Sequence, residues 1–151
     1  MKTILVSVDF SDVTLKVVKA AVHLAKPFQS RIILMHASEP APQLLGIGPG
    51  PDVIPIPSTE EPPSLTDYTE NLARLQEMIS ATGLASMTVD LQGSAIDQIL
   101  AQAENSHVDL IVLGSHRRGP LSHLFLGSVA DGVLKRARCP VLIVPTSDDR
   151  T

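Results

Sequence analysis

Short runs of consecutive apolar residues alternate along this chain with longer segments whose apolar residues recur every three or four positions. In one longer segment, Val17, Ala21, Leu24 and Phe28 stand four, three and four residues apart, which predicts one buried face of a helix. Consecutive apolar residues instead indicate strands that are buried on both faces, as in parallel sheets. Such runs lie within residues 4–8, 31–37, 110–113 and 141–144. The alternation therefore predicts an α/β protein built on a parallel sheet.

Five strands and four helices follow from this pattern. We expect strands at residues 4–8, 31–37, 87–91, 110–113 and 139–144, and helices that begin near residues 12, 65, 94 and 128. Ser11 or Asp12 can cap the first helix, and Ser94 with Asp97 resembles a capping box for the third. This order implies one doubly wound, Rossmann-like sheet with helices on both faces and right-handed crossovers. A length of 151 residues fits a single domain, residues 1–151.

Residues 38–64 break the alternation. They contain eight of the twelve prolines, a density that is incompatible with a regular helix or a central strand. A loop of this length in a compact protein is usually functional, here as a flap or a partner surface. The other interpretation is a tolerated surface insertion, and both stay open.

Composition and charge exclude several classes of function. The net charge of −4 and the aromatic content of 3% argue against nucleic-acid binding. No apolar run approaches the ~20 residues of a transmembrane helix, and Asp9 interrupts the apolar start too early for a signal peptide. The single cysteine, Cys139, permits no intrachain disulfide. We therefore expect a cytoplasmic protein that neither inserts into a membrane nor binds nucleic acid.

Residues 114–128, which contain several glycines, separate the fourth predicted strand from the last predicted helix. A strand, a turn with glycines and a helix that opens at Gly127-Ser128 predict an anion site. The N–H groups of a first helical turn are unpaired, and the helix dipole is positive there. Ligands of doubly wound sheets bind at the carboxyl ends of the strands, where the strand order reverses. If the first and fourth strands are neighbours, Asp9 and Gly114 face one crevice that suits a nucleotide or another phosphorylated small molecule.

Several familiar active sites are missing from the sequence. It contains no Gly-x4-Gly-Lys-Ser/Thr loop, no Gly-x-Gly-x-x-Gly after the first strand and no Gly-x-Ser-x-Gly elbow. His116 and His123 lack the cysteine partners of a structural zinc site. We assign no catalytic residue, and efficient ATP turnover is not expected because no general base or phosphate-loop lysine is in place.

Four segments resemble the universal stress protein family, and the resemblance covers essentially the whole chain. They are residues 4–12, 108–116, 126–129 (Leu-Gly-Ser-Val) and 139–145. The resemblance implies the strand order 3-2-1-4-5 and a regulatory or stress-response module that binds ATP or another adenine nucleotide, with Mg²⁺ or Mn²⁺ on the phosphates. It also implies a homodimer through strand 141–144, with a further protein partner left open.

The same resemblance implies the residues of the nucleotide site. Asp9 would lie near the ribose or a phosphate-bound metal, Ala37 would border adenine, and Leu113 and Gly114 would border the ribose and phosphates. The Gly127-Ser128 turn and the N–H of Val129 would hold phosphate. The full predicted set is Ser7, Val8, Asp9, Ala37, Leu113, Gly114, Ser115, His116, Arg117, Gly119, Gly127, Ser128 and Val129.

Each of these residues also has a purely structural interpretation. Asp9 could cap the following helix, and Ser128 with Asp131 could form a capping box. Ala37 and Leu113 could be ordinary core residues, and His116 could be a polar loop residue.

Arg117 departs from the family pattern. ATP-binding members carry Gly, two residues, Gly, nine residues and then Gly-Ser or Gly-Thr, and the middle glycine falls on Arg117. Gly119 could supply the bend, and the Arg117 guanidinium could either bind phosphate or fill its place. If the Arg117 guanidinium fills the place of the phosphate, the chain is a dimeric interaction protein with a degenerate phosphate loop. A related nucleotide-activating ligase is disfavoured, because residues 9–12 contain no glycine.

Overall fold

The computed structural model describes residues 1–38, 65–115 and 127–145. These residues form a five-stranded parallel sheet in the order β3-β2-β1-β4-β5. The strands are β1 (Thr3–Val8), β2 (Arg31–Ser38), β3 (Ser86–Gln92), β4 (Leu110–Ser115) and β5 (Val141–Pro145). The predicted doubly wound fold and its strand order are confirmed.

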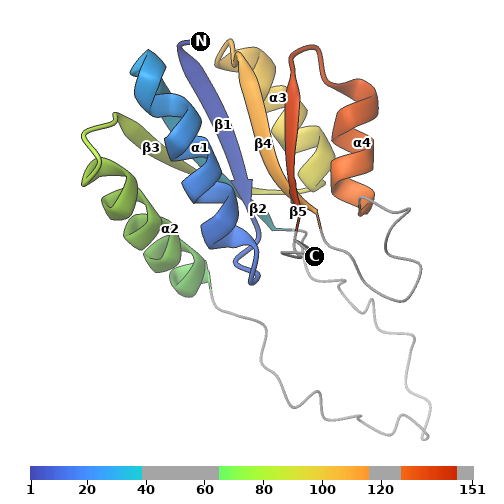
Figure 1. Cartoon of the computed structure of the whole chain (residues 1–151). Coiled ribbons are helices and arrows are strands. Elements are labelled where there is room, and N and C mark those ends of the chain that lie inside the picture. Colours follow the sequence, from blue (N-terminus) through green and yellow to red (C-terminus); the bar gives the residue numbers. More distant parts are fainter. Residues whose placement is uncertain (39–64, 116–126, 146–151) are drawn as a thin grey trace, which may run out of the picture.

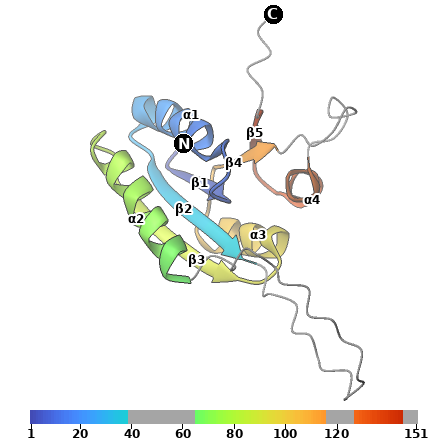
Figure 2. The ribbon, with the colours of Figure 1, turned by 90° about the horizontal axis from the view of Figure 1, so that it is seen from below.

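Four helices cover the two faces of the sheet (Figures 1 and 2). They are α1 (Thr14–Phe28), α2 (Leu65–Ser80), α3 (Ala95–Asn105) and α4 (Ser128–Arg136). Helices α1 and α2 lie on one face and α3 and α4 on the other, as the two separate clusters of buried residues require. None of these helices, within the described residues, is both long enough and apolar enough to cross a bilayer.

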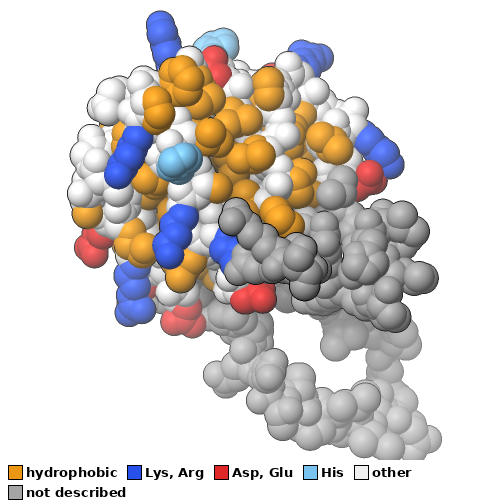
Figure 3. All heavy atoms as spheres, in the orientation of Figure 1, with side chains coloured by type: hydrophobic (Ala, Val, Ile, Leu, Met, Phe, Trp, Pro, Cys, Tyr) orange, Lys and Arg blue, Asp and Glu red, His pale blue; other side chains and the backbone are white. Residues whose placement is uncertain are grey.

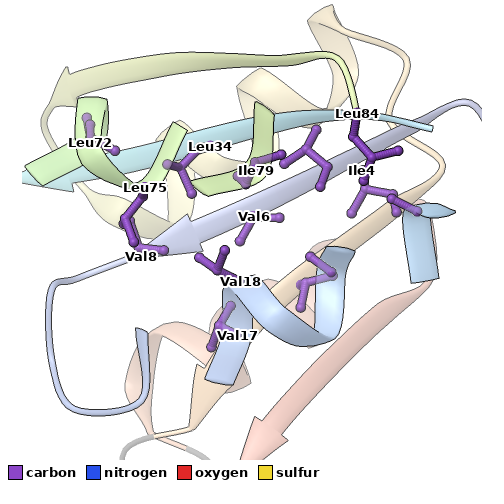
Figure 4. Close-up of a cluster of buried hydrophobic side chains, with 14 of the residues drawn as sticks. Ile4, Val6, Val8, Val17, Val18, Leu34, Leu72, Leu75, Ile79 and Leu84 are labelled. Carbon is purple, nitrogen blue, oxygen red and sulfur yellow. The ribbon is translucent and has the colours of Figure 1, made fainter. Parts of the chain in front are cut away.

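Strand β1 lies at the centre of both cores. Ile4 and Val6 pack with α1 and α2, as Figure 4 shows, whereas Leu5 packs with α3 and α4. All three side chains are fully buried. Side chains of a strand alternate between its faces, so a strand covered on both sides needs apolar residues at consecutive positions. The run of consecutive apolar residues within residues 4–8 has this physical cause.

The register of β1 brings the carboxyl ends of the strands together. Val8 stands opposite His36 of β2, and Val6 stands opposite Val112 of β4. Because β2 follows β1 outward in one direction and β4 in the other, the strand order reverses between β1 and β4. This is the place where doubly wound sheets bind ligands.

The helix starts differ in part from the sequence-based expectations. We expected Ser11 or Asp12 to cap α1, but Val13 occupies the N-cap position and makes no side-chain cap hydrogen bond. At α3 the expected cap is present, since the Ser94 hydroxyl accepts from the Asp97 N–H at 3.5 Å.

Candidate functional site

A cavity of about 100 Å³ opens at the carboxyl edge of the sheet, and we call it the carboxyl-edge cavity. Its walls come from the ends of β1, β2 and β4 and from the first turns of α1, α3 and α4. The lining residues are Ser7, Val8, Asp9, Val13, Thr14, Val17, Ala37, Ala95, Leu113, Gly114 and Val129. Seven residues of the predicted set therefore meet around one cavity: Ser7, Val8, Asp9, Ala37, Leu113, Gly114 and Val129.

The other predicted residues fall into two groups. Ser115 is buried at the end of β4, and Gly127 and Ser128 begin α4 directly before Val129, so these three flank the cavity lining. His116, Arg117 and Gly119 lie outside the described residues.

Asp9 is held in the turn between β1 and α1. Its Oδ1 accepts hydrogen bonds from the Ser11 N–H at 3.1 Å and from the Ser11 hydroxyl at 2.6 Å. The residue between them, Phe10, has a φ of 58°. Asp9 is exposed and does not occupy the cap position of α1. A carboxylate placed this way can accept from a ligand hydroxyl or face a cation.

Gly114 is required by packing between β4 and α1. A Cβ at this position would stand 2.6 Å from Val13 Cγ1 and 3.3 Å from Val17 Cγ2. Both valines belong to the start of α1 and line the cavity. The glycine therefore lets the first turn of α1 approach the end of β4, and this close approach closes one side of the cavity.

Thr14 is a cavity residue that the sequence analysis missed. The side chain is only 6% exposed, and its Oγ1 has no hydrogen-bond partner among the described residues. A buried hydroxyl without a partner costs about 1–3 kcal/mol, so such groups usually have a partner in the functional state. The one available signal was position, because the first turn after β1 must face the carboxyl end of the sheet.

Three further lining residues were missed. The sequence pattern predicts Val17 only as part of the buried face of a helix, and it marks neither Val13 nor Ala95 as a site residue. Their side chains are small or apolar, and such residues carry no chemical signature in a sequence. They shape the cavity without offering polar contacts.

Beside the cavity, the start of α4 presents backbone N–H groups that have no partner within residues 1–38, 65–115 and 127–145. Gly127 is the N-cap residue, with φ 90° and ψ 150° and no side-chain cap. The first N–H to bond inside the helix is that of Asp131, which donates to the Gly127 carbonyl at 3.0 Å. The capping-box interpretation of Ser128 is therefore wrong, and Ser128 is exposed at the first helical position.

The carboxylate of Asp131 is paired away from this helix start. Lys135 Nζ lies 2.7 Å from Asp131 Oδ2, one turn further along α4. Arg136 pairs with Asp97 at 2.9 Å, and Arg138 pairs with Glu104. None of these three cations lines the carboxyl-edge cavity, and Lys135 and Arg136 stand in the last turn of α4, where basic side chains complement the helix dipole.

A second hollow of about 730 Å³ lies between α3 and the end of α4, and we call it the α3–α4 groove. Its lining includes Leu100, Val108, Ile111 and Cys139, and the Arg136–Asp97 and Arg138–Glu104 pairs stand among its polar residues. Burial raises the pKa of the Cys139 thiol. Within the described residues, no group of His, Cys, Asp or Glu in either hollow could hold a metal ion.

Comparison with known proteins gives one consistent family. The family model described as the universal stress protein family matches residues 1–145. Universal stress protein MJ0531 of Methanocaldococcus jannaschii is 32% identical over 148 residues, which cover 95% of this chain and 81% of that protein.

Solved structures of the same fold include two nucleotide complexes. A universal stress protein in complex with cAMP aligns with a TM-score of 0.71 and 23% identity over 97% of this chain and 98% of that chain. The universal stress protein from Archaeoglobus fulgidus in complex with dAMP aligns with a TM-score of 0.66 and 20% identity, over 95% of this chain and 97% of that chain.

Proposed function

This chain belongs to the universal stress protein family, and from that premise we propose that it is a regulatory protein that binds an adenine nucleotide across the carboxyl edge of the sheet, with part of the ligand in the carboxyl-edge cavity. ATP is the favoured ligand, with Mg²⁺ or Mn²⁺ bound through its phosphates. The cAMP and dAMP complexes of proteins with this fold support an adenine nucleotide as the ligand class.

The buried Thr14 hydroxyl carries the proposal. It lines the cavity and lacks a hydrogen-bond partner among the described residues, although it is 6% exposed. A ligand with several hydroxyl and phosphate oxygens would supply that partner. The unpaired N–H groups at the start of α4 would receive negative charge at the same edge of the sheet. These two features together favour a phosphorylated polar ligand over an apolar one.

The proposed roles are those that the family resemblance implies for the residues at this edge of the sheet. Asp9 would face the ribose or a phosphate-bound cation, Ala37 would border adenine, and Leu113 and Gly114 would border the ribose and phosphates. The Gly127-Ser128 turn would hold phosphate through backbone N–H groups. A phosphate seated there would be separated from the Asp131 carboxylate, because Lys135 engages that carboxylate.

Regulation is a better fit than catalysis. Asp9 is the one titratable side chain among the residues that line the described cavity, and two hydrogen bonds from Ser11 already engage its Oδ1. A group that activates water for phosphoryl transfer must be placed to orient the nucleophile. We therefore propose that the bound nucleotide controls conformation or partner binding and is hydrolysed slowly, in a cytoplasmic protein.

The proposal includes a homodimer through β5. This strand forms one edge of the sheet, and Val141, Leu142, Ile143 and Val144 are all half-buried. Figure 3 shows hydrophobic side chains gathered on the face where Figure 1 places β4 and β5. An exposed apolar edge strand favours pairing with another chain. Light scattering should give a dimer that Leu142→Lys converts to monomer or insoluble protein, and an unchanged dimer would argue against this interface.

Calorimetric titration tests the nucleotide proposal directly. Nucleotide-stripped protein is titrated with ATP and Mg²⁺, and we expect saturable binding that Thr14→Val weakens and that replacement of Gly127 and Ser128 abolishes. Ala101→Ser, at the α3–α4 groove, is the matched control and should bind as the wild type does. If the wild type binds no adenylate but Arg117→Gly does, the chain is instead an interaction protein with a degenerate phosphate loop.

A further inference from the structure

Three aromatic rings meet beside the turn that carries Asp9. The ring centroids of Phe10 and His36 are 4.9 Å apart, those of His36 and Tyr68 are 4.4 Å apart, and Phe10 stacks on Tyr68 at 5.7 Å. The chain contains three phenylalanines, one tyrosine and no tryptophan. Half of these four residues therefore gather at one point, which we call the aromatic cluster (Phe10, His36 and Tyr68).

The aromatic cluster joins three parts of the chain. Phe10 belongs to the turn between β1 and α1, His36 lies near the end of β2, and Tyr68 lies in the first turn of α2. His36 is 5% exposed, and its Nδ1 stands 3.0 Å from Asp90 Oδ1 on β3. The imidazole is thus fixed by β3 on one side and by two rings on the other.

Phe10 needs this support because of its backbone. Its φ of 58° lies in the left-handed region, where a bulky side chain is rarely found. Such a conformation persists only where the surrounding structure enforces it. The contacts of the ring with His36 and Tyr68 provide that enforcement. Asp9 and Ser11, on either side of Phe10, form the hydrogen bonds that complete the turn.

We propose that Tyr68 is a positioning residue for the nucleotide site. It does not line the carboxyl-edge cavity, but it holds Phe10 and thereby sets the turn that presents Asp9 and leads into Thr14. The inference rests on the proposed function for the identity of the ligand. It goes beyond it by coupling the occupancy of the cavity to the first turn of α2, which follows residues 39–64 in the chain.

The chain carries its own probe of this coupling. Tyr68 is the single tyrosine and there is no tryptophan, so intrinsic fluorescence excited at the red edge of the tyrosine band reports the aromatic cluster alone. Energetic coupling is reciprocal, so a ligand that uses the turn must also affect the ring that holds it. We expect the Tyr68 signal to follow the calorimetric isotherm for ATP and Mg²⁺. A Tyr68 signal that stays constant to saturation would overturn the coupling.

Substitutions of Tyr68 separate positioning from general stability. Tyr68→Ala should weaken binding of ATP and Mg²⁺ by about five- to tenfold, within the usual range of coupling between sites. Tyr68→Phe keeps the ring and should bind within about twofold of the wild type. Phe28→Ala is the matched control and should change nothing, because the Phe28 ring is 59% exposed at the end of α1 and does not lie on the buried face where the sequence pattern placed it. Equal affinities for Tyr68→Ala and Tyr68→Phe would overturn the inference.

A second measurement works without nucleotide. Amide hydrogen exchange of Ser11 and Thr14, whose N–H groups donate to Asp9 Oδ1 and to the Ser11 carbonyl, should be faster in Tyr68→Ala than in Phe28→Ala, because the turn loses its support. If Tyr68→Ala does not fold, Tyr68→Leu keeps apolar bulk without a ring and takes its place. A wild type that binds no nucleotide refutes the proposed function, and faster exchange would then still support the positioning of the turn. Unchanged exchange would overturn that positioning whether or not ATP binds.

Discussion

The carboxyl-edge cavity and the α3–α4 groove differ in size and in the state of their polar groups. The groove is the larger hollow, at about 730 Å³ against about 100 Å³. Its charged residues Asp97, Glu104, Arg136 and Arg138 are, however, joined in two ion pairs. The smaller cavity contains the buried Thr14 hydroxyl, which has no partner among the described residues, and it adjoins a helix start without a side-chain cap in that same part of the chain.

This difference shows what marks a binding site. Volume alone says how much could fit, whereas an unsatisfied polar group costs free energy until something binds it. A hollow whose charges already pair has less to gain from a ligand, and such exposed pairs are themselves worth little. Candidate binding sites should therefore be ranked by their buried polar groups that lack hydrogen-bond partners, and not by volume alone.

Gly114→Ala tests the close packing of α1 against β4 that forms one side of the carboxyl-edge cavity. Gly114→Ala places a Cβ 2.6 Å from Val13 Cγ1 and should push α1 away from β4. We expect a loss of about 1–3 kcal/mol in the free energy of unfolding, measured by urea denaturation, together with loss of ATP binding. The double variant Gly114→Ala/Val13→Ala should recover part of the stability. Ala101→Met, in the lining of the α3–α4 groove, is the control, and wild-type stability of Gly114→Ala would contradict the packing argument.

Removal of the Thr14 hydroxyl tests whether this group binds a ligand in the carboxyl-edge cavity. Thr14→Val keeps the shape of the side chain but removes a buried oxygen that lacks a partner in the described structure. Without ligand, the variant should be as stable as the wild type or more stable by up to about 1 kcal/mol. With ligand, we expect ATP affinity to fall about three- to tenfold, the value of one hydrogen bond. Thr14→Ser keeps the hydroxyl and should retain the affinity for ATP. A Thr14→Val variant that is less stable than the wild type but binds ATP equally well would mean that the hydroxyl is structural.

The alkylation rate of the Cys139 thiol reports on the α3–α4 groove. Burial raises the pKa of Cys139 above its ordinary value of 9.0, so the protonated thiol dominates at neutral pH. Alkylation by iodoacetamide should be slower than that of free cysteine at pH 7, and its rate should rise with pH and still be rising at pH 9.0, because the raised pKa lies above that value. Saturating ATP should leave this rate unchanged, because Cys139 does not line the carboxyl-edge cavity. Protection by ATP would show that the two hollows are not independent.

The sequence predicts the fold well because each local pattern has a direct physical cause. Ile4, Leu5 and Val6 must be apolar in succession, since β1 is covered on both faces. Ser94 caps α3 as expected, because a hydroxyl followed three residues later by an acid is a local signal. The start of α1 was misjudged, because Ser11 donates to Asp9 within the turn and leaves Val13 as the cap residue.

The candidate site could be predicted only in part, because its remaining features are tertiary. In the sequence, nothing distinguishes Thr14 from other helical threonines. Thr14 is buried only in the folded chain, where α1 packs against β4 at Gly114. Tyr68 fits the apolar face of α2, but its stacking on Phe10 joins residues 58 positions apart and follows from the strand order. Arg117 lies outside the described part of the chain, and titration of Arg117→Gly beside the wild type measures its effect on binding.

The central place of β1 also constrains how the chain is made. Its first residues pair on one side with β2, but on the other side Ile4 pairs with Leu110, which leaves the ribosome much later. At usual rates of synthesis, the roughly 75 residues between the end of β2 and the end of β4 take about 4–15 s. During that interval the nascent chain carries an apolar strand with one open edge, which is a risk for aggregation. A ribosome that stalls before β4 would therefore release a fragment whose central strand has one unprotected edge.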